Sequence, residues 1–185
     1  MEWPALLRYR IVPAAIAAIV FSFLQGGAMA GEPPADASLM GKRIQQSRLT
    51  DSRGIEYLLP AIRDGRVDVV NFWGIRCGSC LEELPKLEAL YGKYREKGVT
   101  VYGINADAAP WEALRPLMEK MNLKFSFPLF TDTQMDLMDG YQVSAAPMTV
   151  ILDGRGIVRY QHVGYQAGDE AKLETEILKV LGAGK

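Results

Sequence analysis

Apolar residues along the chain recur at two different spacings, and the changes between them divide most of it into strands and helices. The nearly continuous apolar run at 67–73 (VDVVNFW) is rich in β-branched and aromatic residues, so it predicts a strand covered on both faces. Beyond Cys80, apolar residues at helical spacing predict a helix that ends at Lys97-Gly98. Residues 100–104 (TVYGI) predict the next strand.

The second half of the chain predicts shorter elements. They are a helix at 110–122, an extended segment at 127–130, a helix at 134–141, strands at 148–152 and 157–161, and a last amphipathic helix containing Leu173, Ile177, Val180 and Leu181. The two strands flank DGRG, which is typical of a hairpin turn. This order predicts one α/β domain in which early parallel strands have crossover helices and a late hairpin forms an antiparallel edge.

Residues 39–63 are less regular, although LLPAIRDG resembles a short helix ending in an Asp-Gly turn. Before them, the start of the chain combines Arg8 and Arg10, fourteen uncharged residues and an Ala-x-Ala exit. This pattern is typical of a secretory signal peptide, and an uncleaved signal anchor is the alternative. We therefore predict a signal peptide at 1–30, a flexible leader at 31–50 and the folded domain at 51–185.

Composition narrows the class of function. The net charge of −1 and the pI near 5.9 give no indication of nucleic-acid binding. The single histidine, His162, excludes metal sites rich in imidazole. No cysteine lies near the Ala-x-Ala exit, which excludes lipid attachment there.

The only two cysteines, Cys77 and Cys80, lie three positions apart in WGIRCGSC. A disulfide across so short a loop stabilises a fold little, which indicates a chemical use for the pair. Cys77 is expected at a helix start beside Arg76, and both features favour its thiolate. Cys80, one turn further along, can then attack a mixed disulfide formed by Cys77.

Other uses of two thiols remain open. Zinc needs four ligands, and one cysteine pair with one histidine does not supply them. Copper(I) can be held by Cys77 and Cys80, with His162 as a third ligand. A plain structural disulfide is the remaining alternative. A peroxidase is not supported, because the chain has no Pro-x3-Thr-x2-Cys run.

Together these residues resemble the thioredoxin superfamily, and in particular its TlpA/ResA-like branch of exported thiol-disulfide oxidoreductases. The resemblance is carried by strand-NFW-x3-Cys-x-x-Cys-x2-Glu-x-Pro, which includes Glu83 and Pro85, and by VSAAPMTVILDGRGIVRYQHVG. It implies a thioredoxin-like α/β fold over 51–185, with a central mixed sheet, helices on both faces and a β-α insertion in the middle.

The resemblance also assigns roles to residues. Cys77 matches the attacking thiol and Cys80 the resolving one, so the redox-active disulfide is the only redox group expected. Trp73 matches the aromatic residue beside the pair and is expected among the substrate-binding residues, with Ala146 and Pro147. Pro147 matches a cis-proline that faces the disulfide, and Ala146 before it pairs with the substrate chain as an added strand.

Two positions depart from the family pattern, and the role of a third depends on where its side chain points. Asn71 stands where thioredoxins have a buried acid, so Cys80 lacks an obvious proton acceptor. Glu83 can serve only if it points inward, and we expect it on the solvated surface of its helix. Arg76 stands where the branch often has Trp, and with the Gly-Ser dipeptide it modulates the redox potential.

The first functional hypothesis is therefore an exported dithiol reductase in the periplasm or on the outer face of a bacterial inner membrane. The resemblance implies a membrane thiol transporter as electron donor and client proteins such as apocytochrome c or copper-site proteins. Only an uncleaved N-terminal segment would contact the membrane. The alternatives are a disulfide-forming oxidant on the same fold and a copper(I) chaperone using Cys77, Cys80 and His162.

Overall fold

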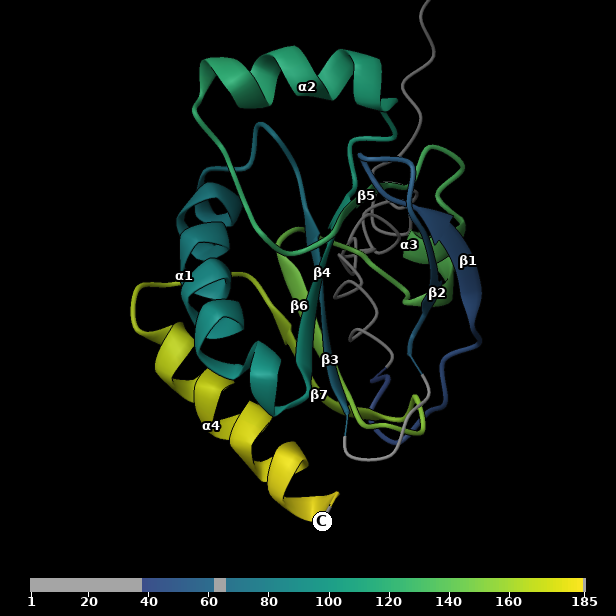
Figure 1. Cartoon of the computed structure of the whole chain (residues 1–185), viewed down its shortest axis with the longest axis vertical. Helices are drawn as coiled ribbons and strands as arrows, with labels where there is room; N and C mark the ends of the chain where they lie inside the picture. The colour runs from purple at the N-terminus through teal and green to yellow at the C-terminus, as the bar shows by residue number, and fades with distance from the viewer. Residues whose placement is uncertain (1–37, 62–65, 185) are drawn as a thin grey trace, which may run out of the picture. The chain divides into compact units, whose positions relative to one another are not determined.

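A five-stranded sheet organises the chain in the computed structural model, which describes residues 38–61 and 66–184 (Figure 1). The strands are β1 (Ser47–Thr50), β2 (Glu56–Leu59), β3 (Val67–Trp73), β4 (Val99–Asn105), β5 (Leu129–Thr131), β6 (Met148–Leu152) and β7 (Val158–Val163). The helices are α1 (Gly78–Tyr94), α2 (Trp111–Lys120), α3 (Asp136–Gly140) and α4 (Asp169–Ala183), and a 3-10 turn, η1 (Arg95–Lys97), follows α1.

The strand order β5-β4-β3-β6-β7 places the most apolar strands inside the sheet. β3 and β4 are buried along their whole length and run parallel, joined by the crossover helix α1. β6 pairs antiparallel with β3 and with β7, and the hairpin between β6 and β7 forms the predicted antiparallel edge. The loop that carries the cysteines follows the end of the central strand β3.

Each face of the sheet has its own apolar core, because successive residues of a strand point to opposite faces. Val69 and Trp73 of β3 pack with α1, α2 and α4. Val70 and Phe72 pack on the other side with α3 and with Leu59 of β2. Figure 1 shows α1 and α4 on one side of the sheet and α3 with β1 and β2 on the other. The predicted thioredoxin-like mixed sheet with helices on both faces is therefore confirmed.

Residues before β3 differ from the prediction. Leu58 and Leu59, expected in a helix, belong to β2, which pairs antiparallel with β1. Asp51 closes this hairpin by accepting the backbone N–H groups of Arg53 and Ile55 at 2.8 and 2.9 Å. Because Leu58 and Leu59 are paired in this hairpin, the helix predicted for residues 58–65 is wrong at these two residues.

The leader predicted for 31–50 is also too long. Leu39 is buried against the core, and β1 occupies the end of the predicted leader. The folded part of the chain thus begins before residue 51. The predicted signal peptide lies outside the described residues, and within 38–61 and 66–184 no helix is long and apolar enough to cross a membrane.

Candidate redox site

The cysteine pair lies where β3 gives way to α1, as the spacing predicts. Cys77 is the N-cap of α1 and is half-buried, while Cys80 in the first turn is fully buried. The two are joined in a disulfide, with Cα atoms 5.2 Å apart. The backbone N–H of Cys80 lies 3.2 Å from Cys77 Sγ, and the Ser79 hydroxyl lies 3.6 Å from it. Cys77 is the sulfur that a partner can reach, and it has donors able to stabilise a thiolate.

The segment before β6 faces the pair. The Ala146 carbonyl oxygen lies 3.6 Å from Cys77 Sγ, and the peptide bond between Ala146 and Pro147 is cis, as the resemblance implies. Ala146 is exposed and Pro147 is buried. An exposed backbone next to the reachable sulfur is the arrangement that strand addition by a client requires.

Trp73 and Arg76 have simpler surroundings. Trp73 is fully buried and packs in the same core as Cys80, so it has no surface with which to contact a client. Its predicted place among the substrate-binding residues is replaced by packing beneath the pair. Arg76 is exposed beside Cys77. Pro85 lies inside α1, as predicted.

Glu83 corrects the sequence interpretation. Its side chain points inward and is 3% exposed, whereas the solvated surface of α1 was expected. Thr149 Oγ1 donates to Glu83 Oε1 at 2.8 Å, and Asn71 Nδ2 donates to Oε2 at 2.9 Å. Cys80 lies three residues earlier, a spacing that places the two side chains on neighbouring faces of one helical turn. The carboxyl is therefore buried about one helical turn from the buried cysteine.

The environment of Glu83 favours its protonated form. Burial raises the pKa of Glu83 from 4.5 to about 7, against the hydrogen bonds from Thr149 and Asn71, which lower it. A carboxyl with a pKa near neutrality exchanges protons readily at physiological pH. Glu83 is therefore a candidate proton acceptor for Cys80, whereas Asn71, in the place of a buried acid, cannot accept a proton.

Asp107, which the sequence analysis did not single out, holds the loop before Cys77. Its Oδ2 accepts the backbone N–H of Ile75 at 2.7 Å and the side-chain amide of Asn105 at 2.8 Å. The carboxylate passes so close to Gly74 that a Cβ there would lie 3.1 Å from Oδ1. Two sequence features could have identified Asp107. They are an acidic residue just beyond an apolar strand and a glycine just before the cysteine loop. Asp107 thus ties the loop that carries Cys77 to the end of β4.

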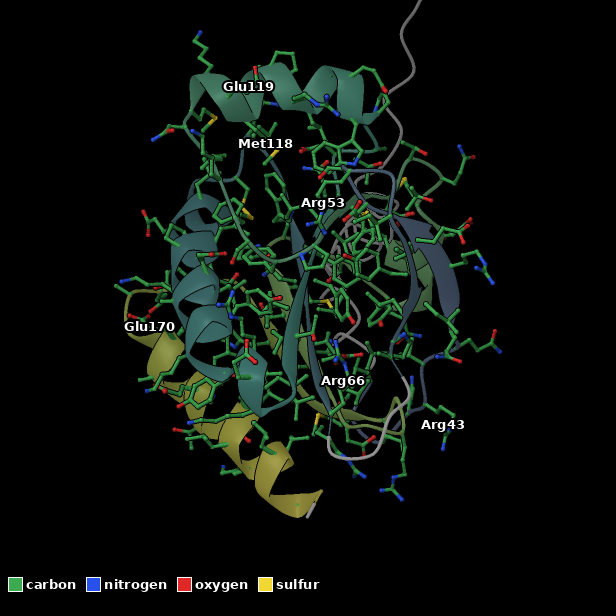
Figure 2. The ribbon with its side chains drawn as sticks, in the orientation of Figure 1. Arg43, Arg53, Arg66, Met118, Glu119 and Glu170 are labelled. Atoms are coloured by element: carbon green, nitrogen blue, oxygen red, sulfur yellow. A yellow bond between two sulfur atoms is a disulfide. The ribbon has the colours of Figure 1, made fainter. Side chains whose placement is uncertain are left out.

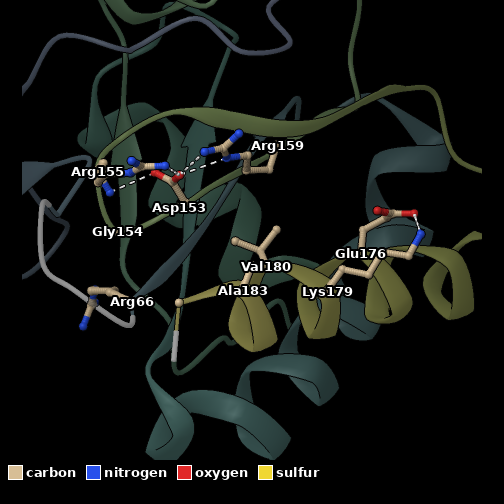
Figure 3. Close-up of a pocket in the computed structure, with 10 residues that line it drawn as sticks. Arg66, Asp153, Gly154, Arg155, Arg159, Glu176, Lys179, Val180 and Ala183 are labelled. Atoms are coloured by element: carbon tan, nitrogen blue, oxygen red, sulfur yellow. Dashed lines mark hydrogen bonds and ion pairs between the residues drawn. The ribbon is translucent and has the colours of Figure 1, made fainter.

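A wide hollow lies elsewhere on the described surface. A depression of about 750 Å³ opens between the β6–β7 turn and the end of α4 (Figure 3). Two ion pairs lie in its wall, Asp153 with Arg159 at 2.7 Å and Lys179 with Glu176 at 2.8 Å, and Arg66 is paired with Asp68 outside it. It contains neither cysteine, so size alone does not identify the functional site.

Possible metal ligands are few. Within the parts of the chain that the structure describes, no group of three or more His, Cys, Asp or Glu side chains is placed to hold a metal ion. His162 lies 3.2 Å from Asp169 and contributes to the wall of a narrow cavity that also includes Glu83. The geometry around the cysteines is that of a dithiol–disulfide pair.

Comparisons with known proteins agree with this geometry. The model of the AhpC/TSA family matches residues 40–161. The chain is 29% identical over 116 residues to thiol-disulfide oxidoreductase ResA of Halalkalibacterium halodurans, a match covering 63% of this chain and 64% of that protein. It is 30% identical over 143 residues to ResA of Geobacillus kaustophilus, covering 77% and 80% of the two chains.

A solved structure gives the same result. The crystal structure of a putative thiol:disulfide interchange protein DsbE from Chlorobium tepidum superposes with a TM-score of 0.69 at 28% identity. That match covers 77% of this chain and 98% of the other. The shared fold, the Cys77–Cys80 pair and these relatives show that the chain belongs to the AhpC/TSA family and, within it, is a thioredoxin-like protein-disulfide oxidoreductase of the ResA type.

Proposed function

We propose that this protein is an exported dithiol reductase that reduces disulfides in selected client proteins. The observation that carries the proposal is the difference in exposure between the two cysteines. Cys77 is reachable at the start of α1, and Cys80 is buried with the carboxyl of Glu83 enclosed behind it. We assign the attack on a client disulfide to Cys77 and the resolving step to Cys80.

The exchange proceeds in two steps. The Cys77 thiolate attacks one sulfur of a client disulfide, and the other client sulfur leaves as a thiolate that takes a proton from water. Cys80 then gives its proton to the Glu83 carboxylate, and its sulfur attacks Cys77 Sγ. The Cys77–Cys80 disulfide forms and the second client thiolate is released. The client gains two electrons and the pair loses two.

Docking of the client uses the segment before β6. The exposed backbone of Ala146, whose carbonyl oxygen is 3.6 Å from Cys77 Sγ, offers hydrogen-bonding groups to an extended client chain. Pro147 anchors this segment, because its own carbonyl accepts the Gly164 N–H at 2.7 Å. A client strand placed there brings its disulfide to the reachable sulfur.

The residues around Cys77 favour a reductant over an oxidant. A strongly oxidising pair requires an unusually stable thiolate at the attacking cysteine. The dipeptide between the cysteines is Gly78-Ser79, which carries no charge. The donors described at Cys77 are one backbone N–H and one hydroxyl, and the neighbouring Arg76 is exposed, so solvent screens its charge; together they stabilise a thiolate moderately.

The location and partners follow from the N-terminal pattern and the family. The signal-like segment at 1–30 supports export to the periplasm or to the outer face of an inner membrane. In that compartment a reductase needs an outside source of electrons, and we assign this role to a membrane thiol transporter. Apocytochrome c and copper-site proteins are the client classes that the resemblance implies.

The reduction potential tests this proposal directly. The purified mature protein is equilibrated with dithiothreitol or glutathione buffers, and the oxidised fraction is measured by thiol alkylation and mass spectrometry. We expect a reduction potential of about −270 mV, in the range of dithiol reductants on this fold. A value near about −120 mV would overturn the reductase proposal in favour of a disulfide-forming oxidant. Copper(I) titration of the reduced protein tests the chaperone alternative.

A further inference from the structure

A row of polar residues crosses the sheet behind Cys80. Asn71 of β3 lies opposite Thr149 of β6, and Thr149 lies opposite His162 of β7. Residues directly opposite each other in antiparallel strands point to the same face. The hydrogen bonds of Asn71 and Thr149 to Glu83 show that this face is the one covered by α1. The row therefore leads from the buried carboxyl of Glu83 to the edge strand β7.

An ion pair closes the outer end of the row. His162 Nε2 lies 3.2 Å from Asp169 Oδ2, in the first turn of α4. The side chains of His162 and Asp169 are 31% and 34% exposed, so both reach solvent. Asp169 Oδ2 also accepts the Gln166 N–H at 2.8 Å, and the His162 ring stacks on Tyr160. These contacts fix the pair in place.

A narrow cavity of about 10 Å³, room for about one water, lies between the pair and Glu83. The titratable or charged groups around it are Glu83 and Lys86 of α1, Tyr160 and His162 of β7, Tyr165 of the following loop, and Asp169 and Glu170 of α4, with Lys172 of α4 over the Tyr160 ring.

The two acidic side chains of α4 beside the cavity, Glu170 and Asp169, have different partners. Glu170, beside α1 in Figure 2, accepts from the Tyr165 hydroxyl at 2.8 Å and lies 3.7 Å from Lys86. Asp169 has His162 as its paired side chain. A histidine changes its charge near neutral pH, whereas a lysine keeps its charge. The group beside Asp169 is an imidazole, and the group beside Glu170 is an ammonium.

We propose that His162 and Asp169 are positioning residues for thiol-disulfide exchange, because they place charged groups on the narrow cavity that Glu83 also lines. The inference rests on the proposed role of Glu83 as proton acceptor for Cys80. The negative charge of Asp169 opposes a second negative charge on Glu83 and contributes to the raised pKa of Glu83. A protonated His162 offsets that charge and makes Glu83 a stronger acid.

Titration of Glu83 by ¹³C NMR of its carboxyl group, in the oxidised protein, tests the inference. Asp169→Asn removes the opposing charge and keeps a hydrogen-bond acceptor, so the midpoint is expected to fall by roughly half a pH unit or more. His162→Gln cannot become charged, so the midpoint is expected to rise by a similar amount. Glu176→Gln removes the same charge from α4 outside the cavity. It is the matched control and is expected to leave the Glu83 midpoint unchanged.

Opposite shifts in the two variants support the inference, because a merely structural role would not move the midpoint in two directions. Unchanged midpoints in both variants, or a shift as large in Glu176→Gln, overturn it. A second measurement separates this from the proposed function. The pH profile of Cys80 alkylation in a reduced Cys77→Ser background should follow the Glu83 midpoint. If the midpoint moves and the Cys80 profile does not, Glu83 is not the acceptor, although His162 and Asp169 still control its charge.

Discussion

At the cysteine end of the sheet, Glu83 is enclosed with two neutral partners, whereas at the opposite end Asp153 lies between two arginines. Burial raises the pKa of Glu83 to about 7. Burial also raises the pKa of Asp153, but hydrogen bonds from Arg159 and from the N–H groups of Ile157 and Arg155 outweigh it and lower the pKa. Among the described residues, no cation forms an ion pair with Glu83.

This contrast separates a chemical site from a structural one. In the wider hollow, Asp153 forms ion pairs with Arg155 and Arg159, which stabilise the β6–β7 turn (Figure 3). The narrow space behind Cys80 contains a carboxyl that can gain or lose a proton near neutral pH. Such perturbed groups gather at functional sites.

The largest expected effect is at the cysteines themselves. Cys80→Ala removes the resolving sulfur, so mixed disulfides between Cys77 and client proteins should accumulate. Cys77→Ala should trap few proteins, and both variants should lose nearly all turnover. Non-reducing electrophoresis followed by mass spectrometry of the trapped species measures this. Equal trapping by the two variants would contradict the division of roles.

Replacement of the buried acid comes next. Glu83→Gln keeps the size of the side chain but cannot accept the Cys80 proton. The resolving step is expected to slow by roughly a hundredfold at pH 7, the usual contribution of a positioned base. Rapid-quench measurement of mixed-disulfide decay reports this step alone. Glu82→Gln, the same change at the exposed neighbouring position, should behave as the unmodified protein.

The same variant should change how stability depends on pH. A carboxyl whose pKa is raised in the folded state from 4.5 to about 7 stabilises the fold fully below pH 4.5. That stabilisation is lost as pH rises through 7. The oxidised protein should therefore lose about 3 kcal/mol of unfolding free energy between pH 4.5 and pH 8 through Glu83.

Urea unfolding of the oxidised protein and of Glu83→Gln at both pH values isolates this contribution, because other groups titrate alike in the two proteins. The stability difference between them should move in favour of the variant at pH 8. A difference that is the same at both pH values would mean that Glu83 titrates with an ordinary pKa.

Much of the fold could be predicted because β3 and β4 are central strands with unbroken apolar sequences. The observed bounds differ from the predicted ones by a residue at most. β1 and β2 were missed because each has four residues and alternates between partly buried and exposed positions, which leaves a weak pattern. Leu58 and Leu59 followed by proline looked like a helix start, and only pairing with β1 shows that they form a strand.

The site was predictable where it is local in sequence. Cys77 and Cys80 were identified from their spacing, and the resemblance located Ala146 and Pro147. The inward position of Glu83 could not be read from an apolar pattern, since its partners Asn71 and Thr149 lie 12 and 66 residues away. Asp107 was missed for the same reason, because its contact with Ile75 spans 32 residues.

A smaller effect is expected at Asp107. Asp107→Ala leaves the Ile75 N–H and the Asn105 amide without their acceptor, which should reduce the unfolding free energy by about 1–3 kcal/mol. It should also loosen the loop that presents Cys77. Asp107→Asn keeps an acceptor oxygen and should lose about 1 kcal/mol or less. Thermal unfolding and the Cys77 alkylation rate are measured for both variants. If neither changes in Asp107→Ala, Asp107 does not hold the loop that presents Cys77.

The smallest effect is expected at the opposite end of the sheet, where Arg159→Ala removes one of the two cations beside Asp153. The side chain of Arg159 is 39% exposed and that of Asp153 15%, so solvent screens the pair and the loss should be about 0–1 kcal/mol at pH 7. Because the pKa of Asp153 is lowered in the folded state, this contribution is present above its ordinary pKa and is lost as pH falls. The variant should therefore approach the stability of the unmodified protein near pH 2.

The reduction potential and the resolving rate of Arg159→Ala should not change, since Asp153 and Arg159 lie at the other end of the sheet from the cysteines. A changed potential in Arg159→Ala would show that the two ends communicate and that the contrast between them is not one of chemistry against structure.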